Sequence, residues 1–341
     1  MNILSLTSLI NMAVSLLPVL AFLVTLVILD SYKLVRLASV LLALVAGCLA
    51  AGVSYLADGG VLIYTGIDPG LFRRYLGPLI EELAKSLYVV YLIRTKRVGF
   101  MVDAAILGFA VGAGFALVEN LYYLQQLDEQ HPILWIIRGF GTAIMHGGAT
   151  AILALIFKNV SDREGSGLLA GFLPGYFIAS VVHSFYNHFF FNPAVSTMLI
   201  IILLPMVMAA VFQRSEASLR RWLGVGFDSD QELLEMLTSG RLLETHVGRY
   251  LQSLREKFRP EAVVDMICFL RIRVELSIQA KGILLMRQSG FEVPPDPEAK
   301  EKFAELRELE KNIGKTGKLA LLPFLHKSDR ELWQLYMLEE N

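Results

Sequence analysis

Residues 101–124, MVDAAILGFAVGAGFALVENLYYL, decide the fold class of this chain. Apart from Asp103 near the start and Glu119 near the end, the stretch carries no charged side chain. A helix needs about 20 mainly apolar residues to cross the hydrocarbon core of a bilayer. The stretch is therefore predicted to be a membrane-spanning helix, and Glu119 is predicted to lie inside the membrane.

The whole chain has the composition of a membrane protein. Of its 341 residues, 55% are hydrophobic and 18% are charged, and the mean hydropathy is +0.53, outside the range of soluble globular chains. The formal net charge is -1, from 31 basic and 32 acidic side chains, so no basic excess indicates nucleic-acid binding. Two cysteines, Cys48 and Cys268, cannot form a disulfide framework, which excludes redox chemistry as the main activity of the protein.

Seven segments have the length and composition of a spanning helix. In chain order they are residues 8–29, 37–57, 76–93, 101–124, 133–157, 167–191 and 195–213. The first lacks the basic start of a signal peptide, so it is expected to be a retained helix. Glycines in the middle segments, among them Gly112, are expected to let helices pack closely. The predicted fold class is all-α, a polytopic membrane helical bundle.

Charge density divides the chain into two predicted domains. The first 213 residues contain 22 lysines, arginines, aspartates and glutamates, whereas the remaining 128 residues contain 41. Residues 1–213 are therefore predicted to form a membrane-embedded domain. Residues 214–341 are predicted to form a soluble helical domain.

The sequence of the soluble domain contains signals for helix starts but no motif that indicates catalysis or cofactor binding. Capping boxes predict helix starts at Ser229 and Ser328, and Pro260 predicts the start of a helix that runs to about Met286. No phosphate-binding loop and no metal-ligand cysteine spacing occur in this part of the sequence. The domain is expected to regulate the membrane domain or to dock an unknown cytoplasmic partner.

Basic residues predict the orientation of the chain, because lysine and arginine in short loops resist translocation. They gather in alternate loops, at Lys33, Arg36, Arg94, Lys96, Arg97, Lys158, Arg163, Arg214, Arg220 and Arg221. Only Arg73 and Arg74 break this pattern. The chain is therefore predicted to be a multi-pass protein of the cell membrane, with an external N-terminus and a cytoplasmic C-terminal domain.

Four consecutive predicted spans carry polar side chains, and such residues are functional candidates because a charge inside a bilayer is costly. The polar residues are Glu81, Glu82, Lys85, Glu119, Asn120, His146, Thr150, His183 and Asn187. Their distances from the predicted span ends put Glu81, Glu119, His146 and His183 in one layer about 12 Å thick, at about 1.5 Å per residue. This layer is predicted to lie in the outer half of the membrane.

Carboxylates and imidazoles at one level suit the hydrolysis of an amide. A glutamate can take a proton from water, a histidine can hold that water or return the proton, and an asparagine can stabilise an oxyanion. Glutamate and histidine are equally ligands that zinc accepts. Both mechanisms stay open at this point. The spans contain no His-Glu-x-x-His helix and no Gly-x-Ser-x-Gly turn, which excludes an ordinary zincin and the usual serine route.

At these residues the sequence resembles the PrsW family of intramembrane proteases, in the superfamily that contains the CAAX-prenyl proteases. The matching positions, within about residues 70–210, are Glu81-Glu82-x-x-Lys85, Phe115-x-x-x-Glu119-Asn120, His146 and His183-x-x-x-Asn187. The CAAX branch would have histidine in place of Glu119, which favours PrsW. The resemblance implies cleavage of a single-pass, membrane-anchored protein near the extracytoplasmic side, in PrsW itself an anti-sigma factor.

The resulting hypothesis is an intramembrane endopeptidase of metallo or glutamate type. In it Glu81 activates water, Glu82 and Glu119 assist, His146 and His183 complete the site, Asn187 stabilises the oxyanion, and Lys85 tunes the carboxylates. If a metal is used, the expected ion is zinc and the expected ligands are Glu81, Glu119, His146 and His183.

Two other classes of function compete with this hypothesis. The first is a non-catalytic scaffold or substrate-presenting subunit of the same superfamily, in which the polar motifs serve helix packing. The second is a proton-coupled transporter that uses the carboxylates as a relay. It ranks last, because the sequence shows no two related halves.

Overall fold

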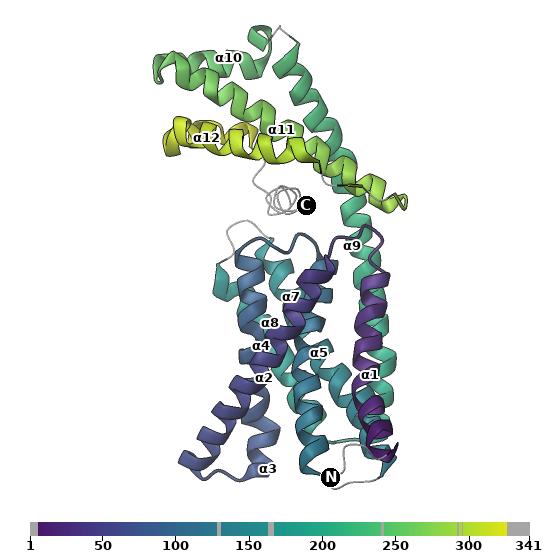
Figure 1. Cartoon of the computed structure of the whole chain (residues 1–341). Coiled ribbons are helices and arrows are strands. Elements are labelled where there is room, and N and C mark those ends of the chain that lie inside the picture. The colour runs from purple at the N-terminus through teal and green to yellow at the C-terminus, as the bar shows by residue number, and fades with distance from the viewer. Residues whose placement is uncertain are drawn as a thin grey trace. The chain divides into compact units, whose positions relative to one another are not determined.

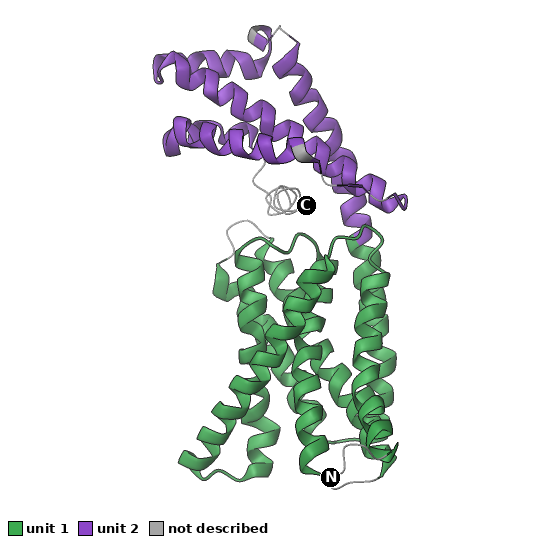
Figure 2. Cartoon of the chain, viewed as in Figure 1, with its two compact units in different colours: residues 1–215 green, residues 216–341 purple. Residues whose placement is uncertain are grey.

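The computed structural model describes residues 6–127, 131–162, 167–239, 242–291, 293–294 and 296–325. Every regular element in these ranges is a helix (Figure 1), which confirms the all-α fold class. The chain forms two compact units, residues 1–215 and residues 216–341 (Figure 2).

The first unit is a bundle of long apolar helices. Its elements are α1 (Leu6–Ile28), α2 (Leu37–Thr65), α3 (Pro69–Leu71), the π-helix η1 (Phe72–Leu76), α4 (Gly77–Arg94), α5 (Met101–Gln126), α6 (Pro132–Ile136), the π-helix η2 (Ile137–Thr142), α7 (Ala143–Ser161), α8 (Leu168–Asn187) and the first part of α9 (Pro193–Thr238). Six stretches of helix in the described residues are long and apolar enough to cross a membrane, with α6, η2 and α7 counted as one. The chain is a multi-pass membrane protein.

Helix α4 coincides with the predicted span 76–93 but is not one of these six. It carries Glu81, Glu82 and Lys85 within five residues, which lowers its hydropathy. The side chains of Glu82 and Lys85 are completely buried, so these charges face protein rather than lipid. Helix α4 therefore supplies charged groups to the interior of the bundle.

Helix α2 is longer than predicted. The predicted span ended at residue 57, but the helix continues past Asp58 to Thr65 and stops at Gly66, which has a left-handed φ of 62°. The side chain of Asp58 is half-buried and close enough to Glu119 to interact with it electrostatically. The charge thus belongs to the bundle and does not mark the end of the helix.

Helix α5 lies at the centre of the first unit and is buried along most of its length. It packs chiefly against α7 and α2. A Cβ atom built on Gly112 would lie only 2.2 Å from the carbonyl oxygen of His146 in α7. The expectation that this glycine allows close helix packing is confirmed, and the approach sets the position of His146.

The second unit contains the rest of α9 and a group of shorter helices. They are η3 (Leu242–Glu244), α10 (His246–Ser253), η4 (Leu254–Glu256), α11 (Pro260–Gln288), α12 (Pro297–Ala320) and η5 (Leu322–Phe324). Helix α11 begins at Pro260 as predicted and packs against α12.

The predicted helix start at Ser229 is wrong, because α9 continues through this residue to Thr238. The neighbouring Asp230 does not take part in a cap. It accepts hydrogen bonds from Ser277 and from Lys281, whose Nζ lies 2.6 Å from Asp230 Oδ2. Asp230 thus joins α9 to α11, and the helix runs unbroken through the predicted start. The other predicted start, Ser328, lies outside the described residues.

Candidate metal centre

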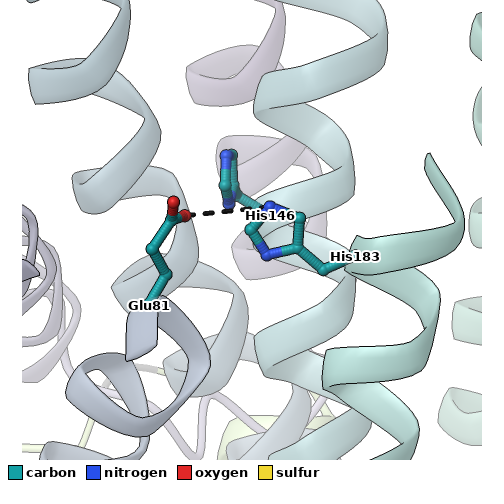
Figure 3. A group of neighbouring side chains, drawn as sticks. All are labelled: Glu81, His146 and His183. Carbon is teal, nitrogen blue, oxygen red and sulfur yellow. Dashed lines mark ion pairs between the residues drawn. The ribbon is translucent and has the colours of Figure 1, made fainter. Parts of the chain in front are cut away.

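Four helices bring the predicted polar residues of the first unit together. Glu81 comes from α4, Glu119 from α5, His146 from α7 and His183 from α8. Figure 3 shows Glu81 and the two imidazoles pointing toward one another from separate helices. Each of Glu81, His146 and His183 offers one possible ligand atom, and these atoms all lie within 4.8 Å of one another.

Two π-helical turns precede the helices that carry Glu81 and His146. One is η1, which leads into α4 at Gly77 and Pro78, and proline lacks the N–H that an α-helix would use. The other is η2, which leads into α7 and contains Gly139. Single π-turns of this kind are frequent at functional sites, because they change the direction of side chains in an otherwise regular helix.

A buried glutamate orients His183. Glu82 Oε1 lies 2.9 Å from His183 Nδ1 and 2.5 Å from Lys85 Nζ, and the side chains of Glu82 and Lys85 have no exposed surface. The imidazole donates its Nδ1 proton to this carboxylate, which leaves the Nε2 lone pair free. Nε2 faces Glu81 Oε2 at 3.7 Å. His183 therefore presents a ligand nitrogen toward Glu81.

The second imidazole has a comparable arrangement. Lys85 Nζ lies 3.0 Å from His146 Nδ1, and because an ammonium only donates hydrogen bonds, Nδ1 is the acceptor. The proton is then on Nε2, which lies 2.8 Å from Glu119 Oε2. Each histidine thus has a glutamate next to one nitrogen. The lone pair on the other nitrogen is free in His183 and accepts from Lys85 in His146.

The predicted oxyanion donor lies apart from these contacts. Asn187 is one turn beyond His183 near the end of α8, and its Nδ2 donates to the backbone carbonyl of Arg73 at 3.1 Å. This hydrogen bond is exposed to the surroundings, whereas His183 is buried. The structure therefore brings together Glu81, Glu82, Lys85, Glu119, His146 and His183, and it places Asn187 at the edge of this group.

Sequence reasoning missed two charged residues near the cluster. Arg138 in η2 lies with Nη2 3.3 Å from Glu119 Oε1, and it could have been noticed as the one arginine within the predicted span 133–157. Asp58 interacts electrostatically with Glu81 as well as with Glu119. Asp58 lies one residue beyond the predicted end of the second span, so it was not considered as an intramembrane charge.

The charges and unpaired atoms of the cluster fit a divalent cation. Four carboxyl groups, those of Asp58, Glu81, Glu82 and Glu119, are grouped with only two cationic side chains, Lys85 and Arg138. Among the described residues, the Oε2 atoms of Glu81, Glu82 and Glu119 are buried without a hydrogen-bond partner. The 3.7 Å between His183 Nε2 and Glu81 Oε2 is close to the roughly 3.4 Å between ligand atoms of a tetrahedral zinc ion.

Comparison with known protein families identifies the membrane unit. Residues 31–212 match the model of the PrsW family intramembrane metalloproteases. Searches of the curated proteins and of the solved structures found no match. The resemblance inferred from the sequence motifs is confirmed, and the matching region contains the whole Glu and His cluster. Because that region covers more than half of the 341 residues, the chain belongs to the PrsW family of intramembrane metalloproteases.

Proposed function

We propose that this protease hydrolyses a peptide bond of a membrane-anchored protein at the cluster of Glu81, His146 and His183. The observation that carries the proposal is the position of their ligand atoms within 4.8 Å of one another, from three different helices. Two imidazoles and one carboxylate are the ligand set of many catalytic zinc sites, and they leave a coordination position open for water. Zinc is therefore the proposed ion.

The proposed ligand atoms are the imidazole nitrogens on the side away from the neighbouring glutamates. At Nδ1 of His146 the metal would replace the hydrogen bond from Lys85. Glu82 holds Nδ1 of His183, and Glu119 faces Nε2 of His146. Carboxylates on the far nitrogen of a metal-bound histidine are common, because they set the tautomer and orient the ring. When bound, zinc would polarise the substrate carbonyl and make the bound water more acidic.

Glu81 is the proposed general base. Lys85 pairs with Glu82 and Arg138 pairs with Glu119, whereas no lysine or arginine in the described part of the chain lies within ion-pair distance of Glu81. A carboxylate without a cationic partner is the better proton acceptor. One oxygen of Glu81 suffices as a ligand, and the other can take a proton.

In the proposed reaction, the water oxygen forms a bond to the carbonyl carbon and one water proton moves to Glu81. The C–N bond then breaks, and Glu81 returns this proton to the leaving amine. Asn187 is the proposed oxyanion donor, because Nδ2 carries two N–H groups and the hydrogen bond to the Arg73 carbonyl uses one. Lys85 and Glu82 have no exposed surface. The proposed role of Glu82 is to hold His183, and that of Lys85 is to pair with Glu82.

The proposed substrate is a single-pass protein, of the anti-sigma-factor type, cut near the extracytoplasmic side. The support for this side is the alternation of basic loops along the chain, which also argues for a cytoplasmic C-terminal unit. Partial exposure of Glu81 and Glu119, at 18% and 25%, supports access of a peptide to the cluster. The proposed role of the C-terminal unit is to dock a partner or regulate cleavage.

The test is cleavage of a panel of single-pass reporter proteins by the purified protein in liposomes. Wild type is compared with Glu81→Gln and His183→Ala, with and without a chelator, and the zinc content of each protein is measured. The matched control is His188→Ala, since His188 lies at the end of the same helix and its Nδ1 contacts the Ser184 carbonyl.

The proposal expects cleavage by wild type and His188→Ala, none by the two cluster variants, and inhibition by the chelator. Cleavage that survives complete removal of the metal would contradict the zinc centre and favour water activated by glutamate alone. If wild type cuts no reporter even with native membrane partners added back, a scaffold function replaces the proposed hydrolysis.

A further inference from the structure

Arg138 makes three contacts around one glutamate. Its Nε donates to Asn120 Oδ1 at 3.0 Å, and its Nη2 lies 3.3 Å from Glu119 Oε1. Its guanidinium carbon also lies 3.9 Å from the centre of the Tyr123 ring. All three partners belong to α5, within one turn of one another. The planar guanidinium suits this arrangement because its donors have fixed directions.

These contacts continue a chain of interactions that starts in the first helix. Asn120 Nδ2 donates to the backbone carbonyl of Ser15 in α1 at 2.8 Å, and its Oδ1 accepts from Arg138. Glu119 then faces both Arg138, through Oε1, and His146, through Oε2. The residues that match the family begin at 31, so α1 supports the cluster from outside the matching region.

Burial of the Arg138 charge inside the membrane unit costs free energy, which indicates a functional reason for its position. A charged side chain inside a membrane is unfavourable unless it is paired, and Arg138 is only 12% exposed. Glu119 alone would pair the charge. The additional bond to the buried Asn120, which is itself held by α1, instead restricts where the guanidinium can lie.

We propose that Arg138 is a positioning residue of the metal centre, which holds Glu119 against Nε2 of His146 and thereby fixes the orientation of this imidazole. The inference rests on the proposed function, because it requires zinc at this site. Removal of a carboxylate partner on the far side of a metal-bound histidine weakens metal binding by about 10 to 100-fold. Replacement of Arg138 is expected to weaken metal binding by a similar factor, because it releases Glu119.

The experiment measures zinc affinity of the full chain in detergent by competition with a chelator. The variants are Arg138→Ala, Arg138→Lys, Glu119→Gln and the double variant Arg138→Ala with Glu119→Gln. The matched control is Arg94→Ala, because Arg94 is exposed at the end of α4. Thermal unfolding without zinc is measured for each variant, so that a loss of fold is distinguished from a loss of metal.

Arg138→Ala is expected to bind zinc about 10 to 100-fold more weakly than wild type, and Arg94→Ala is expected to bind it equally well. Lysine at this position should restore part of the affinity, because it keeps the charge but cannot contact Asn120 and Glu119 together. When Glu119 is already replaced by glutamine, the additional replacement of Arg138 by alanine should weaken zinc binding little further.

Two results would overturn the inference alone. They are a zinc affinity of Arg138→Ala equal to that of wild type, or an equally large loss whether or not Glu119 is present. A wild-type protein that binds no zinc would overturn both the inference and the proposed zinc centre, so the two failures are distinguishable.

Discussion

Substitution of Gly112 by alanine is expected to disable the cluster without touching any of its side chains. The new Cβ would lie 2.2 Å from the His146 carbonyl oxygen and 2.7 Å from the Gly147 Cα, whereas ordinary contact begins at 3.4 Å. Helix α7 must therefore move away from α5 by about 1.2 Å, the difference between 3.4 and 2.2 Å. Backbone atoms form the obstacle, so no side-chain rotation can relieve it.

A movement of this size separates groups that must stay together. His146 Nε2 in α7 lies 2.8 Å from Glu119 Oε2 in α5, and a shift of about 1.2 Å would break this contact. A misplacement of about 1 Å at a catalytic group can lower the rate by about 100-fold. The strain of an extra methyl group in a packed core costs about 1–3 kcal/mol, partly offset by the helix propensity of alanine.

The assays are reporter cleavage in liposomes, zinc affinity and thermal unfolding. The matched control is Gly52→Ala in α2, where a new Cβ would meet no atom within 4 Å. The expected result is a loss of cleavage of about 100-fold for Gly112→Ala and unchanged cleavage for Gly52→Ala. If the two variants cleave and bind zinc equally well, the close approach of α5 and α7 does not control the geometry of His146, and the reasoning is refuted.

Three further substitutions test other parts of the structure. Lys85→Met is expected to lower the free energy of unfolding by about 3–5 kcal/mol, because it leaves the buried Glu82 charge uncompensated, and denaturant unfolding in detergent measures this. Asp58→Asn is expected to weaken zinc binding by about tenfold at most, since Asp58 acts on the cluster electrostatically. If zinc binding falls as much as it does when a metal ligand is removed, Asp58 is itself a ligand. Lys281→Met should lower the melting temperature of the C-terminal unit, because Asp230 loses its cationic partner, while zinc affinity stays unchanged.

Local sequence features were sufficient to predict the elements of the bundle. A run of apolar residues has one favourable conformation in a bilayer, because a helix satisfies every backbone hydrogen bond within itself. Each predicted span accordingly coincides with a helix or a run of helices. The limits of the helices were predicted less well, since α2 continues beyond its predicted end at residue 57 and α9 continues through the predicted helix start at Ser229.

The sequence by itself determined that the chain is a helical membrane protein, which polar residues lie inside it and to which family they point. Hydrophobic length and the cost of intramembrane charge depend only on the local composition, so both can be inferred from the residues alone. Only the tertiary structure decided that Glu82 and Glu119 back the two histidines, that Arg138 joins them and that Asn187 lies at the edge. These relations depend on the rotation and spacing of helices that are distant in the sequence. Close contacts between helices, such as that of Gly112, set this rotation and spacing, and no local sequence pattern encodes them.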